Sequence, residues 1–126
     1  MSDDKKGLVL LVHGSRDPGW MVPFAELRDR VASKAPGARV IIACMQFGAP
    51  TVEEALSGLA REGIREIVVA PVFISALGHV RKDVPGQVEK ARKKFPELKV
   101  TISPAVGELP EVQAALRDVL VRLAGK

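Results

Sequence analysis

The stretch LVLLVHGSRDPGWMVPF, residues 8–24, is the most informative part of the sequence about the fold. In it, a continuous apolar run leads directly into a loop that opens with His-Gly. Five apolar residues in a row, residues 8–12, are typical of a strand covered on both faces. After the loop, apolar residues recur at helical spacing: Trp20, Phe24, Leu27 and Val31. This opening fits an α/β-hydrolase with its oxyanion loop, or a parallel sheet that holds a histidine beside a metal ion.

The strand-then-helix pattern repeats along the chain. The apolar runs that predict strands are residues 8–12, 40–45, 66–74 and 99–103. Three further helical stripes follow them: Val52, Ala55, Leu56, Leu59 and Ala60; Val84, Val88, Ala91 and Phe95; Val112, Ala115, Leu116, Val119, Leu120 and Leu123. Right-handed crossovers then predict an α/β fold, with a four-stranded parallel sheet of order 2-1-3-4 and helices on both faces. We expect a single domain over residues 1–126.

Capping signals support the helix assignments. Thr51 and Glu54 have the spacing of a capping box at the start of the second helix. Pro110 suits the first turn of the fourth helix. Asp83 is expected to cap the third helix, and Ser15 and Asp17 to shape the turn after the first strand.

Composition narrows the function classes. The chain has one Trp, four Phe and no Tyr, which disfavours a stacking platform for nucleic acid. The sequence shows neither a signal peptide nor a membrane span, and Cys44 stands alone within an apolar run, so we expect a cytoplasmic protein with a buried core thiol. The net charge of +4 supports at most a weak preference for anionic ligands.

Both histidines of the chain follow strands. His13 comes directly after the first strand, and His79 lies in the expected loop after the third strand. Ligands of open α/β sheets bind beyond the carboxyl ends of the strands, where the strand order reverses. Two imidazoles there could share a divalent Co, Ni, Fe or Zn ion, in an open site that holds a metal briefly. The bland alternative is that each histidine merely caps or hydrogen-bonds its own loop.

The hydrolase interpretation is excluded because the sequence lacks the nucleophile motif. An α/β-hydrolase needs the pentapeptide G-x-S-x-G at a strand-to-helix turn, and the sequence contains none. A signalling or adaptor domain of flavodoxin-like architecture is also disfavoured, because only Asp17 offers a carboxylate near the expected strand ends. The two-histidine metal site and the alternative of two ordinary loop histidines both stay open at this point.

Three motifs resemble the small CbiX-type sirohydrochlorin chelatases, which are similar to one half of the larger class II tetrapyrrole chelatases. They are LLVHGSRDP (residues 10–18), PTVEEAL (residues 50–56) and VVAPVFISALGHVRKDVP (residues 68–85), of which the last is the most specific. The resemblance implies a lyase that inserts Co²⁺, or in related members Ni²⁺ or Fe²⁺, into sirohydrochlorin in cobalamin or sirohaem biosynthesis. It also implies a homodimer.

The resemblance carries site residues with it. His13 and His79 would be metal ligands and catalytic residues, and one or both of them would accept the pyrrole protons. The candidates for binding the substrate are Arg16, Arg81 and Lys82, whose charges would meet its carboxylates, together with Gln46. The alternative for each of the three cations is an ordinary loop charge in water. Gln46 stands where family members commonly carry a glutamate, so an alternative is a non-catalytic protein that binds or delivers a metal or a tetrapyrrole. Glu108 is a minor candidate to face the cleft.

Overall fold

The computed structural model describes residues 5–75 and 78–125, and it describes the backbone of His79 but not its side chain. The elements in chain order are β1 (Lys6–Val12), α1 (Val22–Lys34), β2 (Ala38–Cys44), α2 (Val52–Arg61), β3 (Glu66–Pro71), α3 (Gly78–Lys94), β4 (Lys99–Ile102), the 3-10 helix η1 (Val106–Glu108) and α4 (Pro110–Leu123).

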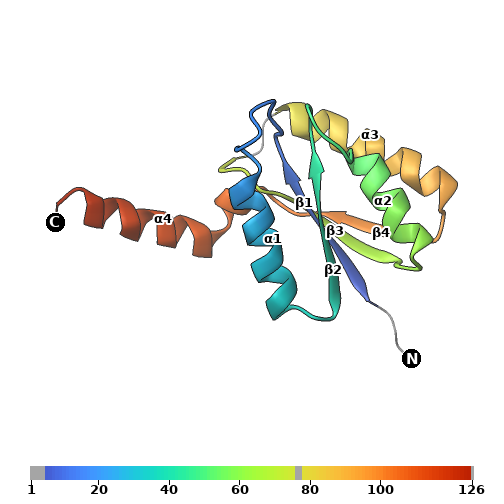
Figure 1. Ribbon diagram of the computed structural model, residues 1–126, viewed down its shortest axis with the longest axis horizontal. Coiled ribbons are helices and arrows are strands. Elements are labelled where there is room, and N and C mark those ends of the chain that lie inside the picture. The colour runs from blue at the N-terminus through green and yellow to red at the C-terminus, as the bar shows by residue number, and fades with distance from the viewer. Residues whose placement is uncertain (1–4, 76–77, 126) are drawn as a thin grey trace.

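Across these residues, four strands form one parallel sheet of order β2-β1-β3-β4 (Figure 1). β1 lies between β2 and β3, with Val12 opposite Cys44 and Leu11 opposite Pro71. The predicted strand order is confirmed. Because every strand runs the same way, the loops that follow β1, β2, β3 and β4 gather at one edge of the sheet, as they do in other open α/β folds.

The main core lies between the sheet and the helices α2 and α3. Val9, Leu11 and Val69 are fully buried there, together with Leu56 of α2 and Val84 of α3. The predicted capping box starts α2: the Thr51 hydroxyl accepts from the backbone N–H of Glu54, and the Glu54 carboxylate accepts from that of Thr51. This packing positions the two central strands, β1 and β3, which pair side by side up to Leu11 and Pro71.

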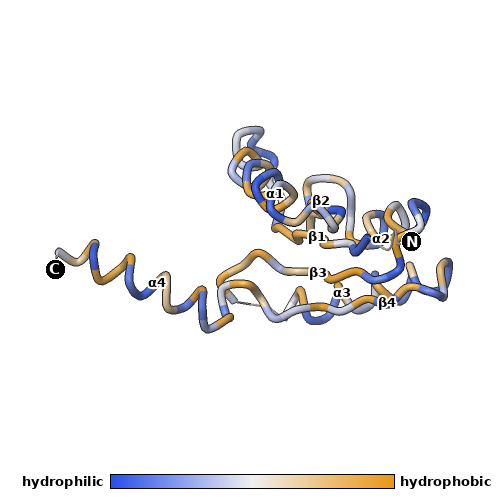
Figure 2. The backbone as a smooth tube through the Cα atoms, turned by 90° about the horizontal axis from the view of Figure 1, so that it is seen from below, coloured by the Kyte–Doolittle hydropathy of each residue, from blue (hydrophilic) through white to orange (hydrophobic). Residues whose placement is uncertain are grey.

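The opposite face of the sheet is covered differently. α1 packs on β2, whereas α4 extends away from the body of the molecule (Figures 1 and 2). Pro110 lies in the first turn of α4, as predicted, but no residue of this helix is buried. The described part of the chain contains no helix with the length and apolar character to cross a membrane.

Three expectations about the third strand and helix are wrong. β3 ends at Pro71 rather than residue 74, and α3 begins at Gly78, so His79 lies in the first turn of a helix and not in a loop. Asp83 therefore lies inside α3 and cannot be its N-cap. The apolar stripe of α3 includes the buried Val80, one turn before Val84. The three charged residues between these valines make the helical period difficult to recognise in the sequence.

Candidate functional site

His13 follows β1 directly and presents an exposed imidazole at the carboxyl edge of the sheet. Its ring stacks on the ring of Phe73, with 4.1 Å between centroids and 24° between planes. Phe73 is only 8% exposed, so it forms a fixed apolar base under a ring that solvent can reach. The sheet and Phe73 together hold the imidazole in place while leaving it open to a ligand.

The loop after β2 is held against His13 through its backbone. The ladder continues beyond the strands, with Met45 N–H donating to the Val12 carbonyl at 2.9 Å and Gln46 N–H donating to the His13 carbonyl at 3.1 Å. Gly14 has φ +89°, and a Cβ at this position would overlap the carbonyl oxygen of Gln46. Only glycine allows this approach, which fixes exposed Gln46 beside His13.

Arg16 and Phe47 form a cation–π pair at the same edge. The Arg16 guanidinium carbon lies 4.4 Å from the centroid of the Phe47 ring, within the range of a cation–π contact. Phe47 is 51% exposed and has φ 55°. The predicted turn-shaping roles are confirmed: the Ser15 hydroxyl accepts from Asp17 N–H, and the Asp17 carboxylate accepts from Gly19 N–H.

The loops after β3 and β4 meet beside Phe73. Gly107 N–H donates to the Phe73 carbonyl at 2.8 Å, and a Cβ at Gly107 would overlap the backbone of Ile74. This contact ties η1 to the base under His13. The loops at the carboxyl edge are therefore joined in series: backbone hydrogen bonds link Gln46 to His13 and Gly107 to Phe73, and the stacked rings link His13 to Phe73.

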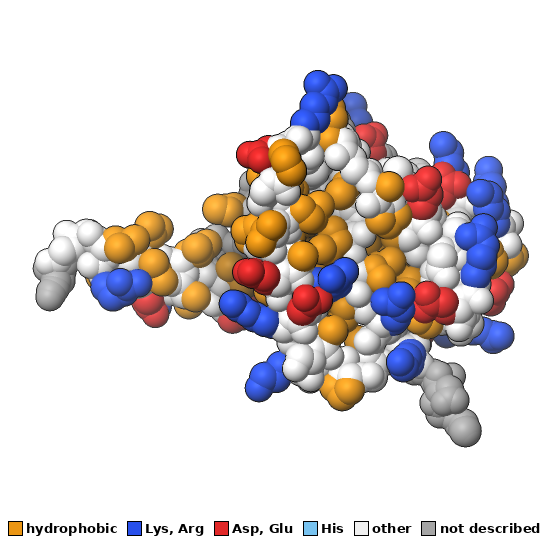
Figure 3. Space-filling view, in the orientation of Figure 1, with side chains coloured by type: hydrophobic (Ala, Val, Ile, Leu, Met, Phe, Trp, Pro, Cys, Tyr) orange, Lys and Arg blue, Asp and Glu red, His pale blue; other side chains and the backbone are white. Residues whose placement is uncertain are grey.

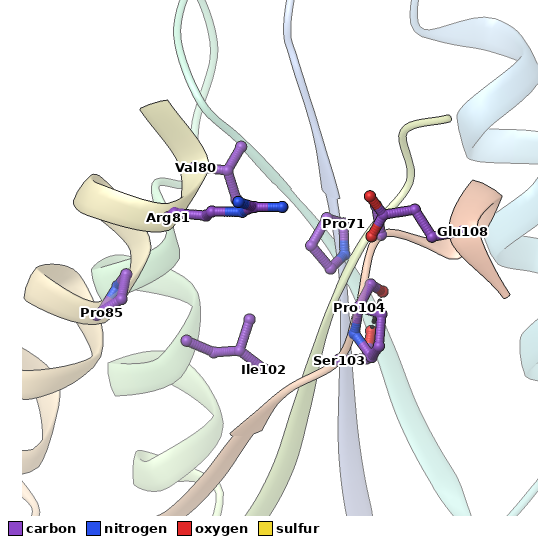
Figure 4. A pocket seen from close by; sticks show the side chains of 9 residues that line it. Pro71, Val80, Arg81, Pro85, Ile102, Ser103, Pro104 and Glu108 are labelled. Atoms are coloured by element: carbon purple, nitrogen blue, oxygen red, sulfur yellow. Dashed lines mark hydrogen bonds between the residues drawn. The ribbon is translucent and has the colours of Figure 1, made fainter. Parts of the chain in front are cut away.

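A cavity of about 370 Å³ opens next to this contact, between α3 and the segment that follows β4. Arg81 of α3 and Glu108 of η1 extend toward each other across it, and Pro71, Ile102 and Pro104 form its apolar walls (Figure 4). The cavity is mainly apolar and carries one cation and one carboxylate at its mouth. Glu108 thus does face a cavity at the carboxyl edge.

The remaining predicted residues lie on α3. Lys82 is exposed on this helix, one residue beyond Arg81. The side chain of His79 lies outside the described residues, so the meeting of two imidazoles stays a prediction. Among the described residues, no group of three His, Cys, Asp or Glu side chains could hold a metal ion.

Cys44 is a core residue rather than a ligand. Its side chain is 2% exposed, and burial raises the pKa of its thiol above the ordinary value. The thiolate is the form that binds metals, so a raised pKa disfavours metal binding near neutral pH. This confirms the expected buried thiol.

The sequence interpretation missed two aromatic residues, Phe73 and Phe47. Each lies within three residues of the carboxyl end of its strand, Pro71 for β3 and Cys44 for β2. That position was the available signal, since ligand-binding loops of open parallel sheets begin there. Phe73 was instead included in the third strand.

The fold and the site define a class: an open parallel α/β domain with its ligand edge at the strand carboxyl ends, where an exposed imidazole lies among aromatic and cationic side chains. Within that class the chain belongs to the CbiX family, whose family model matches residues 7–123.

Two relatives share the name sirohydrochlorin cobaltochelatase. The chain is 34% identical over 83 residues to the sirohydrochlorin cobaltochelatase of Methanosarcina acetivorans, a match that covers 66% of this chain and 64% of the relative, just under two thirds of its length. It is 31% identical over 110 residues to the sirohydrochlorin cobaltochelatase of Saccharolobus solfataricus, which covers 80% of this chain and 82% of that protein.

Solved structures share the architecture. A protein of Marinobacter aquaeolei VT8, described as a CbiX protein of cobalamin (vitamin B12) biosynthesis, superposes with a TM-score of 0.79 at 27% identity, covering 95% of this chain and 98% of that one. The sirohydrochlorin chelatase SirB of Bacillus subtilis subspecies spizizenii, solved in complex with cobalt, gives a TM-score of 0.69 at 20% identity and covers 80% of this chain and 43% of that one. The second likeness shows the shared fold alone, with this chain matching less than half of the longer protein.

Proposed function

We propose that this protein inserts a divalent metal, with Co²⁺ favoured over Ni²⁺ and Fe²⁺, into sirohydrochlorin. The observation that carries the proposal is the exposed His13 imidazole, stacked on Phe73 at the carboxyl edge of the sheet. The family match and the names of the relatives supply the substrate. The metal is a substrate of this reaction rather than a resident cofactor.

In this proposal, His13 and His79 receive the incoming ion and later accept protons. Imidazole nitrogen is a good ligand for late divalent ions, and a site with few protein ligands leaves positions for the ring nitrogens. As the ion enters the macrocycle, two N–H protons must leave it. A histidine that has just released the metal has a free ring nitrogen to take one of them.

The substrate is a flat macrocycle with carboxylates around its rim, and the edge of the sheet offers groups that match both features. The exposed Phe47 ring offers an apolar surface for the macrocycle, and Arg16 lies against that ring. Arg81 at the mouth of the cavity and Lys82 on α3 add two further cations. Arg pairs with carboxylates in a bidentate manner, so we assign Arg16 and Arg81 to the rim carboxylates, with Lys82 in support.

Gln46 has a positioning role in this account. Its backbone is bonded to His13, and its side chain is exposed at the same edge. An amide can offer a carbonyl oxygen to the ion but cannot take up a proton near neutral pH. Proton acceptance then falls to the histidines, and the turnover rate should be lower than with a carboxylate at this position.

We further infer that the protein is a cytoplasmic homodimer. The carboxyl edge of one copy offers only one wall for a macrocycle, and a second copy would supply the other. The matched region covers 43% of the longer SirB chain, which leaves room in that protein for a second unit of this size.

Metallation of sirohydrochlorin by Co²⁺ changes its absorption spectrum, and the rate of that change tests the proposal. The protein should accelerate metallation over the uncatalysed reaction, and His13→Ala should lower the rate on the order of 100-fold. Lys99→Ala, at the amino edge of the sheet, is the matched control and should leave the rate unchanged.

His79→Ala is the parallel test of the second predicted ligand. Acceleration that survives both histidine substitutions would contradict the assigned roles. Binding of cobalt or sirohydrochlorin without acceleration would instead assign the protein to metal or tetrapyrrole delivery, the function that the amide of Gln46 favours.

A further inference from the structure

A polar cavity of about 410 Å³, the α2 cavity, lies along α2 and apart from the site described above. Its lining comes from α2 with its cap and from the end of α3: Thr51, Glu53, Glu54, Ser57, Arg61 and Lys94. α2 and α3 pack side by side, and both run from the carboxyl edge of the sheet back toward its amino edge (Figure 1). Arg61 and Lys94 are the last residues of the two helices, so the cationic end of the α2 cavity lies at the far end from His13.

Ser57 has a buried hydroxyl that the packing of the domain leaves without a partner. Its side chain is 4% exposed, and among the residues that the structure describes it is the one buried polar side chain. Its Oγ atom makes no hydrogen bond within the protein. A buried donor without a partner destabilises a fold, whereas alanine suits a helix interior without that cost. A serine at this position therefore indicates a partner from outside the chain, such as a ligand in the cavity that it lines.

Arg61 places a cation at the end of the α2 cavity. Its guanidinium carbon lies 5.7 Å from the centroid of the Phe95 ring, and Phe95 packs against the core. A guanidinium that stacks on an aromatic face keeps its N–H groups available at its edge. Within residues 5–75 and 78–125, Arg61 forms no ion pair with an Asp or Glu side chain. The ring thus orients the guanidinium, and its charge is not neutralised.

The two carboxylates of the α2 cavity already have partners. Glu53 pairs with Lys94 at 3.3 Å, and the Glu54 carboxylate closes the capping box of α2. Figure 3 shows charged side chains of both signs at the side of the molecule where α2 and α3 end. With these pairs counted, the cavity keeps one positive charge, at Arg61, and one donor without a partner, at Ser57.

We propose that the α2 cavity binds a small organic carboxylate between Arg61 and Ser57. These two residues lie on one face of α2 at a spacing of four, and the guanidinium can donate two parallel hydrogen bonds to a carboxylate. Rotation of the covered Ser57 side chain to another staggered χ1 position brings its hydroxyl to the same group. One positive charge without a partner matches a monoanion. Glu53, one turn before Ser57, repels the second charge of a phosphate.

A nuclear magnetic resonance titration of the full chain with sodium acetate, at constant ionic strength, tests the site and needs no metallation activity. Acetate should shift the backbone amide signals of residues 58–60 to a plateau, and sodium chloride should not. Arg61→Lys keeps the charge but removes the planar fork, and Ser57→Ala removes the hydroxyl. Each should weaken acetate binding at least about 10-fold. Arg92→Lys is the matched control, because Arg92 lies outside the cavity and pairs with Glu89, and it should bind acetate like the parent.

The same titration can overturn the proposal. Equal shifts with chloride, or acetate binding that persists in Arg61→Lys and Ser57→Ala, would show that the cavity holds no carboxylate site. Tighter binding of inorganic phosphate than of acetate would overturn the carboxylate as its ligand.

Thermal melts without acetate test the hydroxyl separately. Ser57→Ala should raise Tm by roughly 3–6 °C, because it removes a buried donor that has no partner in the free protein. A lower Tm would show that the hydroxyl is bonded within the chain and would remove Ser57 from the site.

Discussion

Gly14→Ala should destabilise the protein and should also displace the loops that hold His13 at the carboxyl edge of the sheet. Gly14 has φ +89°, a conformation that costs a residue with a Cβ about 1–2 kcal/mol. The new methyl group would also overlap the Gln46 carbonyl oxygen and lie 3.4 Å from the Cβ of Cys44. Relief requires the β2 loop to move, which breaks or weakens the bond from Gln46 N–H to the His13 carbonyl, worth about 1 kcal/mol net. The expected loss is about 2–3 kcal/mol in the free energy of unfolding.

Gly63→Ala is the matched comparison, because Gly63 has nearly the same φ, +90°, but nothing within 4 Å of its Cβ position. It should cost only the conformational part, about 1–2 kcal/mol. Urea unfolding followed by circular dichroism measures both variants, and in thermal melts Gly14→Ala should lower Tm by roughly 6–15 °C. Gly14→Ala should also slow metallation at a temperature where it is folded, and Gly63→Ala should not. If Gly14→Ala proved as stable as Gly63→Ala, the close approach of the two loops would be refuted.

Three further predictions follow from the same geometry. Phe73→Leu keeps an apolar base under His13 but removes the stacked ring. The rate of metallation should therefore fall at a temperature where the variant is fully folded, as its Tm shows. An unchanged rate would make Phe73 a core residue only. Gln46→Glu should raise the metallation rate, because a carboxylate can accept the proton that the amide cannot, and a rate no higher than that of the parent would remove Gln46 from the reaction. The raised pKa and burial of Cys44 should make its alkylation by iodoacetamide at pH 7.5 much slower in the folded protein than in urea, as mass spectrometry would show, and rapid labelling of the folded chain would contradict its burial.

The sheet could be predicted from the sequence because its strands are apolar on both faces. The run of residues 8–12 has no polar interruption, and turn residues such as Pro36 and Gly37 separate the elements. The end of β3 could not be predicted in this way. Phe73 and Ile74 continue the apolar run, although one leaves the ladder to support His13 and the other is exposed.

The contacts within the site could not be predicted from the sequence either. The sequence places His13 and Gln46 after neighbouring strands, but the backbone bond between them depends on the register of β1 with β2. The amphipathic stripe of α4 predicts a helix with an apolar face and says nothing of which surface covers it. Its outward course is set by the tertiary contact of Gly107 with the β3 loop, more than 30 positions away in the chain.

The central claim is that His13 binds the metal at the carboxyl edge of the sheet, and the position of cobalt in a soaked crystal tests it most directly. The account predicts an anomalous peak at the cobalt absorption edge at a bonding distance of about 2.1 Å from a ring nitrogen of His13, with His79 as the second protein ligand. A cobalt ion bound elsewhere, with the His13 imidazole free at saturating metal, would contradict it.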